Sequence, residues 1–180
     1  LILINDLSFF ISHRLSIAEA ALSKDFNVVI GYGALGGADP KALEQRGFRM
    51  NFIPMHSGGT SILKDFRTIF YIWKFLKKER PDIVHSHSRR GADFLAGYVT
   101  KLGAIPNVIS RRVDSIEPKF LSNLRYRLFR KVIVISKKIY DILKDTGIDQ
   151  EKLVLIRSAV DVKRFKKFAD KMLFLKEFNI

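Results

Sequence analysis

Short apolar runs alternate with longer stretches of helical periodicity along this chain of 180 residues. Seven runs are expected to be strands, at 1–5, 27–30, 48–55, 83–86, 107–110, 132–135 and 153–156. Helices are expected between them, at about 12–23, 40–45, 61–79, 92–102, 121–129 and 136–144. Strands that alternate with helices of this length are typical of βαβ units. We therefore predict an α/β fold in which helices cover both faces of a mostly parallel sheet of about seven strands.

Four of these helices carry more specific expectations. Ser12 is a suitable N-cap for the first helix, Asp39 followed by Pro40 suits the start of the second, and Ser136 is expected to cap the helix that runs to Lys144. In the long helix at 61–79, the apolar residues that recur at helical spacing are Ile62, Phe66, Ile69, Phe70, Trp73 and Leu76. Because helices cover sheets with such faces, we expect this aromatic stripe to pack in the core.

The composition excludes several classes of protein. With 47% hydrophobic residues the chain is not intrinsically disordered, and without Cys it has neither disulfides nor thiolate metal sites. No apolar run reaches about 18 residues, so no transmembrane helix is expected, and the polar residues after Ile4 argue against a signal peptide. These features fit a cytoplasmic protein. Because the sequence lacks an initial Met and ends in a basic segment, we expect it to continue beyond both ends.

The chain is strongly basic, with 32 Lys and Arg against 18 Asp and Glu and a net charge of +14. Residues 1–60 hold five basic and five acidic side chains, so the excess lies further along. A field of this sign attracts nucleic acid, anionic lipid headgroups or phosphorylated substrates. Composition alone leaves these three partners open.

The segment 82–90 indicates a binding site. An expected strand ends there in His85 and His87, which are followed by Arg89 and Arg90. At the carboxyl ends of parallel strands, polar groups line the crevice in which ligands bind. His85 taken alone is better interpreted as a core residue. The cluster as a whole predicts an anion-binding edge of a cleft.

Two other cationic segments are candidates for binding anions. The Ser-His-Arg segment at 12–14 is expected at a helix N-terminus, where free N–H groups and the helix dipole favour an anion. Arg111 and Arg112 follow the fifth strand, and neighbouring arginines suit phosphate or carboxylate. Two alternatives remain open: a simple cap with solvated charges for the first segment, and pairing of one arginine with Asp114 for the second.

Neither the glycine-rich segments nor the histidines indicate a cofactor. Residues 31–36 match G-x-G-x-x-G, but they follow the second strand, and the next strand ends without an acid to hold a ribose, so a connecting loop is favoured. Residues 56–60 lack the G-K-[ST] ending of a phosphate-binding loop and are interpreted as a strand-to-helix loop near the cleft. We expect His85 and His87 to point to opposite sides of their strand, so no metal site is predicted.

Read in order, five segments resemble the N-terminal half of bacterial GT-B glycosyltransferases of the family-4 type. They are 9–15 (FFISHRL), 80–90 (RPDIVHSHSRR), 109–114 (ISRRVD), 132–136 (VIVIS) and 156–165 (IRSAVDVKRF). The last is similar to the family's N-G-V-D-x-x-R-F motif, with Ser158 and Ala159 in place of Asn and Gly. The resemblance covers nearly the whole chain and depends on the order and spacing of these segments.

The resemblance implies a Rossmann-like three-layer α/β/α sandwich that forms one half of a GT-B fold. Residues 1–165 would be the acceptor domain, and residues 166–180 would begin a linker toward a C-terminal domain that binds the nucleotide-sugar donor. The family's E-x7-E glutamate pair lies in that second domain and does not occur in this sequence. An isolated acceptor domain is expected to be inactive. Transfer in this family retains the anomeric configuration and usually needs no metal, so no cofactor is expected.

The resemblance also implies roles for individual residues. His87 matches the family's histidine that faces the reacting sugar and is the expected catalytic residue. The expected substrate-binding residues are Ser12, His13, Arg89, Arg90, Arg111, Arg112 and Asp114. Ser12 and His13 would replace the Gly-Gly loop that lets the donor diphosphate approach in many members. The arginines would bind an anionic acceptor such as a phosphorylated lipid or a lipopolysaccharide core, and the basic helices would dock on the acidic inner face of the cell membrane.

Two other functions remain open. One is a nucleotide-sugar epimerase of the same architecture, which would release no glycoside. The other is a nucleic-acid-binding module driven by the positive charge. Against the second, the aromatic residues fall at core spacing rather than on an exposed stacking surface.

Overall fold

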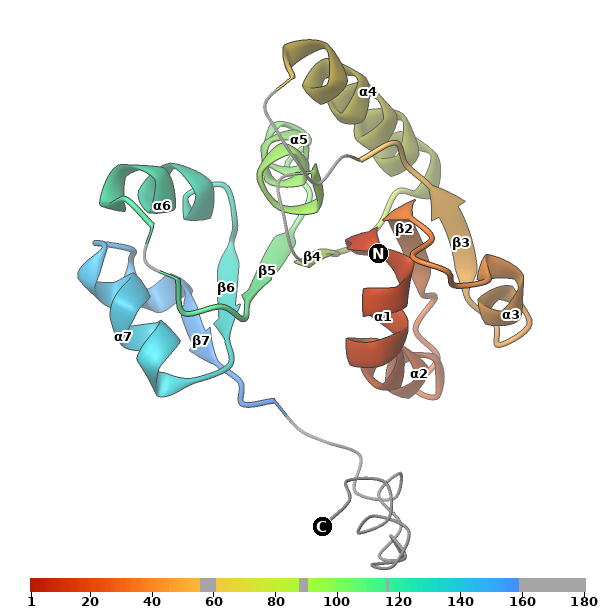
Figure 1. Cartoon of the computed structure of the whole chain (residues 1–180), viewed down its shortest axis with the longest axis horizontal. Helices are drawn as coiled ribbons and strands as arrows, with labels where there is room; N and C mark the ends of the chain where they lie inside the picture. Colours follow the sequence, from red (N-terminus) through yellow and green to blue (C-terminus); the bar gives the residue numbers. More distant parts are fainter. Residues whose placement is uncertain (56–60, 88–90, 116, 159–180) are drawn as a thin grey trace, which may run out of the picture.

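The structure, a computed structural model, describes residues 1–55, 61–87, 91–115 and 117–158 (Figure 1). Its strands are β1 (Ile2–Asp6), β2 (Val29–Ala34), β3 (Arg49–Phe52), β4 (Val84–His87), β5 (Asn107–Arg111), β6 (Lys131–Val134) and β7 (Leu153–Leu155). Its helices are α1 (Leu7–His13), α2 (Leu15–Leu22), α3 (Pro40–Glu44), α4 (Ile62–Glu79), α5 (Ala96–Leu102), α6 (Lys119–Tyr126) and α7 (Lys137–Asp145). A π-helical turn, η1 (Gly91–Leu95), leads into α5, and a 3-10 turn, η2 (Gln150–Lys152), precedes β7.

The seven strands of the described residues all pair in parallel, in the order β3-β2-β1-β4-β5-β6-β7. In the middle, Ile4 of β1 lies opposite Tyr32 of β2 on one side and His87 of β4 on the other. The chain builds β1 to β3 in one direction, returns through α4 and builds β4 to β7 in the other. The carboxyl ends of β1 and β4 therefore form the topological switch point, where open α/β sheets bind ligands. The predicted Rossmann-like α/β architecture, with about seven parallel strands, is confirmed.

Helices cover the sheet from both sides. Leu3 of β1 belongs to a core cluster with Phe75 of α4 and Val99 of α5, whereas its neighbour Ile4 belongs to a cluster with Phe10 of α1. Since successive residues of a strand point to opposite faces, α1 to α3 lie on one face and α4 and α5 on the other (Figure 1). A third cluster joins α6 and α7 to β5, β6 and β7.

The first helix begins earlier than predicted. α1 starts at Leu7 directly after β1, and the carboxylate of Asp6 caps it by accepting hydrogen bonds from the backbone N–H of Ser8 (2.9 Å) and Phe9 (3.3 Å). Ser12 lies in the last turn of α1, where its Oγ donates to the carbonyl of Ser8 at 3.0 Å. The prediction of Ser12 as N-cap is therefore wrong, because the last residue of the strand already provides the cap.

Arg14 separates α1 from α2. Its backbone, with φ −128° and ψ −16°, departs from helical values, although its N–H still donates to the carbonyl of Phe10 at 2.7 Å. The predicted single helix is thus two helices that meet at this residue. The side chain of Arg14 is buried, with 7% exposure.

α4 packs against the sheet with a different side from the one predicted. The buried residues of this helix are Thr68, Ile72, Phe75 and Leu76. The prediction of an aromatic core stripe holds for Leu76 and partly for Ile69, but it is wrong for four exposed residues, Ile62, Phe66, Phe70 and Trp73. The physical reason is that α4 carries apolar residues on more than one side, so periodicity alone does not select the side that faces the sheet.

No helix within the described ranges combines the length and the apolar character needed to cross a bilayer.

β2 continues into the glycine-rich segment that was predicted to be a connecting loop. Gly31 and Gly33 lie inside this strand, and a Cβ at Gly33 would come within 2.9 Å of the carbonyl oxygen of Met55 and 3.0 Å of that of Asn5. Glycine is required at this position because the neighbouring backbones approach closely. The connecting loop therefore begins only after Ala34. The predicted caps Asp39 and Ser136 are both confirmed.

Candidate functional site

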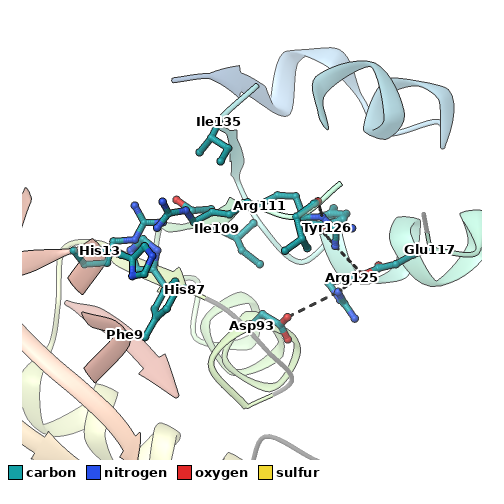
Figure 2. Close-up of a pocket in the computed structure, with 14 residues that line it drawn as sticks. Phe9, His13, His87, Asp93, Ile109, Arg111, Glu117, Arg125, Tyr126 and Ile135 are labelled. Carbon is teal, nitrogen blue, oxygen red and sulfur yellow. Dashed lines mark hydrogen bonds and ion pairs between the residues drawn. The ribbon is translucent and has the colours of Figure 1, made fainter. Parts of the chain in front are cut away.

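A cavity of about 780 Å³ opens at the carboxyl edge of the sheet, beside the switch point between β1 and β4. The residues that line it are Phe9, His13, Arg14, His87, Asp93, Ile109, Ser110, Arg111, Arg112, Val113, Glu117, Arg125, Tyr126 and Ile135. They come from β4 and β5 themselves, from the segments that follow β1, β4, β5 and β6, and from α6 (Figure 2). Distant parts of the sequence therefore meet at the place where an open α/β sheet binds its ligand.

His87, the predicted catalytic residue, ends β4, lines the cavity and is only 2% exposed. Its Nδ1 atom is buried and has no hydrogen-bond partner among the described residues. The ring of His85 lies beside it, with the two ring centroids 3.9 Å apart, and Nε2 of His85 is 2.8 Å from Oγ of Ser110. The prediction that the two histidines point to opposite sides is wrong, because residues two apart in a strand share a face.

Both imidazoles are neutral at physiological pH. Burial, together with the charge of Arg14, lowers the pKa of His85 to about 3. Burial also lowers the pKa of His87 well below its usual value, and His85, Arg14 and Arg112 act in the same direction. A neutral imidazole offers one donor and one acceptor nitrogen, so His87 can exchange a hydrogen bond with a ligand hydroxyl.

Arg111 is engaged within the protein. Its guanidinium group donates to Oε1 of Glu117 (2.7 Å), to the hydroxyl of Tyr126 (3.1 Å) and to the carbonyls of Val113 (2.8 Å) and Ser115 (2.6 Å). These bonds hold the loop after β5 against α6. The geometry therefore departs from the predicted substrate-binding role of Arg111, because its donors are already used.

An ion-pair network continues along this wall of the cavity (Figure 2). Nη1 of Arg125 lies 2.8 Å from Oε1 of Glu117 and 3.9 Å from Oδ2 of Asp93. Burial raises the pKa of Asp93, and the charge of Arg125 opposes that change. No sequence pattern marks these three residues, because only the fold brings η1 and α6 together.

Two further guanidinium groups line the cavity, those of Arg14 and Arg112. In the part of the chain that the structure describes, Nε and Nη2 of Arg14 and Nη1 of Arg112 are buried and have no hydrogen-bond partner. No ion pair joins either group to a carboxylate of the described residues. Burial and the charge of Arg112 lower the pKa of Arg14 to about 10. Arg112 was a predicted site residue, whereas the sequence indicated Arg14 only as a neighbour of Ser12 and His13.

His13 also lines the cavity, and its ring stacks on that of Phe9 with the centroids 4.3 Å apart. Ser12 does not line the cavity, but its Oγ lies 2.6 Å from Nδ1 of His13. Since α1 ends at His13, both residues lie at a helix C-terminus. Both residues were predicted at a helix N-terminus, where the dipole favours an anion, and this prediction is therefore wrong.

Asp114 lies outside the cavity. Its exposed carboxylate is 2.5 Å from Nζ of Lys138, rather than paired with a neighbouring arginine. The predicted site residues Arg89 and Arg90, and the predicted loop at 56–60, fall outside the described residues. Where the structure describes the chain, no three His, Asp or Glu side chains gather as metal ligands would.

Comparison with known proteins gives the site a context. The sequence profile described as Glycosyltransferase Family 4 matches residues 13–164. The chain is 26% identical over 129 residues to the UDP-Gal:alpha-D-GlcNAc-diphosphoundecaprenol alpha-1,3-galactosyltransferase of Escherichia coli, a match that covers 65% of this chain and 33% of that protein.

Two solved structures show a similar fold. A glycosyltransferase from Rickettsia africae has a TM-score of 0.73 at 20% identity over 99% of this chain and 48% of its own. A UDP-GlcNAc 2-epimerase from Neisseria meningitidis, bound to UDP-GlcNAc, has a TM-score of 0.59 at 13% identity over 99% of this chain and 53% of its own. The chain therefore spans about half the length of these structures and a third of the E. coli relative.

Proposed function

Because the chain belongs to glycosyltransferase family 4, we propose that it is the acceptor-binding half of an enzyme that transfers a hexosyl group from a nucleotide sugar. The observation that carries this proposal is the cavity at the β1–β4 switch point, lined by the buried, neutral His87. A concave site with a few convergent polar groups suits a sugar and its linkage.

His87 is proposed to position the reacting sugar. Its neutral imidazole would bond a sugar hydroxyl, and an uncharged ring avoids repulsion with the nearby guanidinium groups of Arg14 and Arg112. His85 and Ser110 would hold the ring in place from the adjacent positions of β4 and β5.

The donor is proposed to bind mainly to a second domain. The similar solved structures are about twice as long as this chain, so a protein of their length would have room for a second domain of this kind. We therefore expect no transfer by the 180 residues alone. Retention of the anomeric configuration, without a metal or other cofactor, is the mechanism we propose from family membership.

The acceptor is proposed to be an anionic glycolipid of lipopolysaccharide or cell-envelope biosynthesis. The name of the E. coli relative specifies a sugar linked to diphosphoundecaprenol. The net charge of +14 would attract such a phosphorylated acceptor and the acidic surface in which it is embedded.

α4 supports a position on the inner face of the cell membrane. Its exposed apolar side chains include Leu63, Phe66, Phe70 and Trp73. Its exposed cations are Lys64, Arg67, Lys74, Lys77 and Lys78. Apolar residues among cations are typical of helices that lie in the interface of an anionic bilayer. We propose that α4 docks the protein there.

A product analysis tests the proposed activity. An enzyme that contains this chain and the donor-binding domain of a family-4 relative is incubated with labelled nucleotide sugars and a prenyl-diphosphate-linked N-acetylglucosamine. We expect a labelled glycolipid, and none from the 180-residue chain alone. An epimerised nucleotide sugar without glycoside would favour the epimerase, with which the chain shares its fold. Tight, steeply salt-dependent retention of oligonucleotides would favour a nucleic-acid-binding module.

A further inference from the structure

We propose that Arg14, Arg112 and His87 form a binding site for a phosphoryl group in the cavity at the β1–β4 switch point. The identity of the substrate that carries this group rests on the proposed function, whereas the binding itself is argued from the side chains alone.

The first argument is the state of Arg14. This residue is 7% exposed, and two of its guanidinium nitrogens are buried with no hydrogen-bond partner in the described ranges of the chain. A buried charge without a counter-ion destabilises a fold. A bound anion would supply the missing counter-ion, and Arg14 lines a cavity in which such a ligand could bind.

The second argument is the contrast with the two other arginines of the same cavity. Arg111 and Arg125 both bond Oε1 of Glu117, at 2.7 Å and 2.8 Å. The protein thus supplies a carboxylate where an arginine holds structure together. It supplies none for Arg14 and Arg112 among the described residues, which leaves their donors for a ligand.

The third argument is the convergence of donors. Arg14 lies at the break between α1 and α2, Arg112 follows β5, and His87 ends β4, which lies between β1 and β5 in the sheet. The charges of Arg14 and Arg112 both act on the His87 ring. Because His87 is neutral, its unpartnered Nδ1 can donate to the same anion in one of its two tautomers.

A phosphoryl group matches these donors best. Guanidinium groups form forked hydrogen bonds with phosphate oxygens, and two of them balance the double charge of a phosphoryl group. Both a nucleotide-sugar donor and a lipid-linked acceptor carry diphosphate, so either substrate has the required chemistry.

Binding of inorganic pyrophosphate to the 180-residue chain, measured by calorimetry, tests the site. We expect Arg14→Met and Arg112→Met each to weaken binding at least tenfold, since each removes charge-assisted hydrogen bonds. Arg130→Met removes an exposed arginine that does not line the cavity and serves as the matched control. Equal affinity in all four proteins would overturn the proposal, and so would malonate binding as tightly as pyrophosphate.

Thermal unfolding separates this role from a structural one. Without ligand, Arg14→Met is expected to melt at a higher temperature than the parent, because an unpaired buried charge is replaced by an apolar side chain of similar length. Pyrophosphate should raise the melting temperature of the parent but not that of the variant. A variant that melts lower, or does not fold, would show that Arg14 supports the structure and would contradict the proposal. Arg14→Lys keeps the charge but not the fork and should recover part of the affinity.

Competition identifies the source of the phosphoryl group. Displacement of pyrophosphate by uridine diphosphate would assign the site to the donor, and displacement by farnesyl diphosphate would assign it to the acceptor. If neither competes, the inference is wrong even if glycosyl transfer is observed. If pyrophosphate binds through Arg14 and no glycoside forms in the transfer assay, the proposed function fails and the phosphoryl site stands.

Discussion

The rings of His85 and His87 lie on the same face of β4 with their centroids 3.9 Å apart; His87 is buried, His85 is half-buried, and the charge of Arg14 acts on both. Two imidazoles at this distance cannot both carry charge at low cost, and the nearby guanidinium increases that cost further. The pair is therefore held neutral by the fold, and this has consequences for both stability and catalysis.

The first prediction concerns stability in mild acid. Below about pH 6.5 the unfolded chain binds protons at His85 and His87, whereas in the folded chain burial lowers both pKa values, that of His85 to about 3. Stability should therefore fall as the pH drops through this range, with a loss of about 1.4 kcal/mol from His85 between pH 7.5 and 5.5 and a further loss from His87. Urea unfolding at several pH values measures the slope, and His85→Asn or His87→Asn should reduce it. An unchanged slope in both variants would contradict the assignment.

The second prediction concerns the reaction. In an enzyme with a donor-binding domain, His87→Asn should lower kcat about 10–100-fold, the effect of one lost hydrogen bond to the reacting sugar. Because the ring stays neutral, the acid limb of the pH–rate profile should not move with this substitution. Initial rates over a pH series provide the measurement. Ser16→Ala, which truncates an exposed side chain of α2 that does not line the cavity, is the control, and loss of activity there would point to a structural cause.

The third prediction concerns the bonds of Arg111. Arg111→Met leaves the Tyr126 hydroxyl, Glu117 and two loop carbonyls without its donors, so the free energy of unfolding should fall by roughly 2–4 kcal/mol. Lys138→Met breaks the exposed pair with Asp114 and should change stability too little to measure. Denaturant titration compares the two. A neutral Arg111→Met would mean that this guanidinium is free to serve the ligand instead.

The fourth prediction concerns the close approach at Gly33. A Cβ there would meet the backbone carbonyls of Met55 and Asn5, so Gly33→Ala should destabilise the fold by about 1–3 kcal/mol. Gly103→Ala is the matched change, because Gly103 has φ −79° and only ordinary contacts, and it should be neutral or stabilising. Melting temperatures of the two variants give the comparison, and equal values would contradict the packing of β2.

The fifth prediction concerns α4. Trp73 is the only tryptophan of the chain, so its fluorescence reports on this helix directly. Vesicles that contain phosphatidylglycerol should shift the emission to the blue, and added salt should reverse part of the binding. The double change of Phe66 and Phe70 to Ser should weaken partitioning by about tenfold or more. Phe26→Ser removes an exposed phenylalanine outside α4 and should have no effect. Equal binding to neutral phosphatidylcholine vesicles would contradict the proposed role of the cations.

The strands were predictable because parallel strands buried on both faces are apolar at successive positions. Leu3 and Ile4 illustrate this, since both are fully buried although they face opposite layers of helices. The alternation of such runs with helices also determined the fold class correctly. The helix caps at Asp39 and Ser136 were predictable for the same local reason, since each side chain satisfies the first N–H groups of its own helix.

Local patterns failed where tertiary packing decides. α4 carries apolar residues on two sides, and only contact with the sheet selects Ile72 and Phe75 over Phe66 and Phe70. The start of α1 was missed because Asp6 ends β1 and caps the helix at once, so no loop marks the boundary.

The candidate site was predictable in part. His87 and Arg112 were found from their places after strands, which the sequence shows. Arg111 and Arg14 differ because the fold brings Glu117 and Tyr126 into hydrogen-bonding contact with Arg111 and not with Arg14. That difference follows from distance in space, and no spacing along the chain encodes it.

The order of the strands also determines when the cavity can exist. β1 precedes the other six strands in the sequence, but it pairs with β4 only after α4 has been made. The edge of β1 that pairs with β4 therefore stays unpaired while β2 and β3 are translated. Phe9, His87, Ser110 and Ile135 come together only when β4, β5 and β6 have joined the sheet. A ligand in the cavity would therefore slow hydrogen exchange in α1, β4 and β5 together, because it would contact α1 from the first half of the folding order and β4 and β5 from the second.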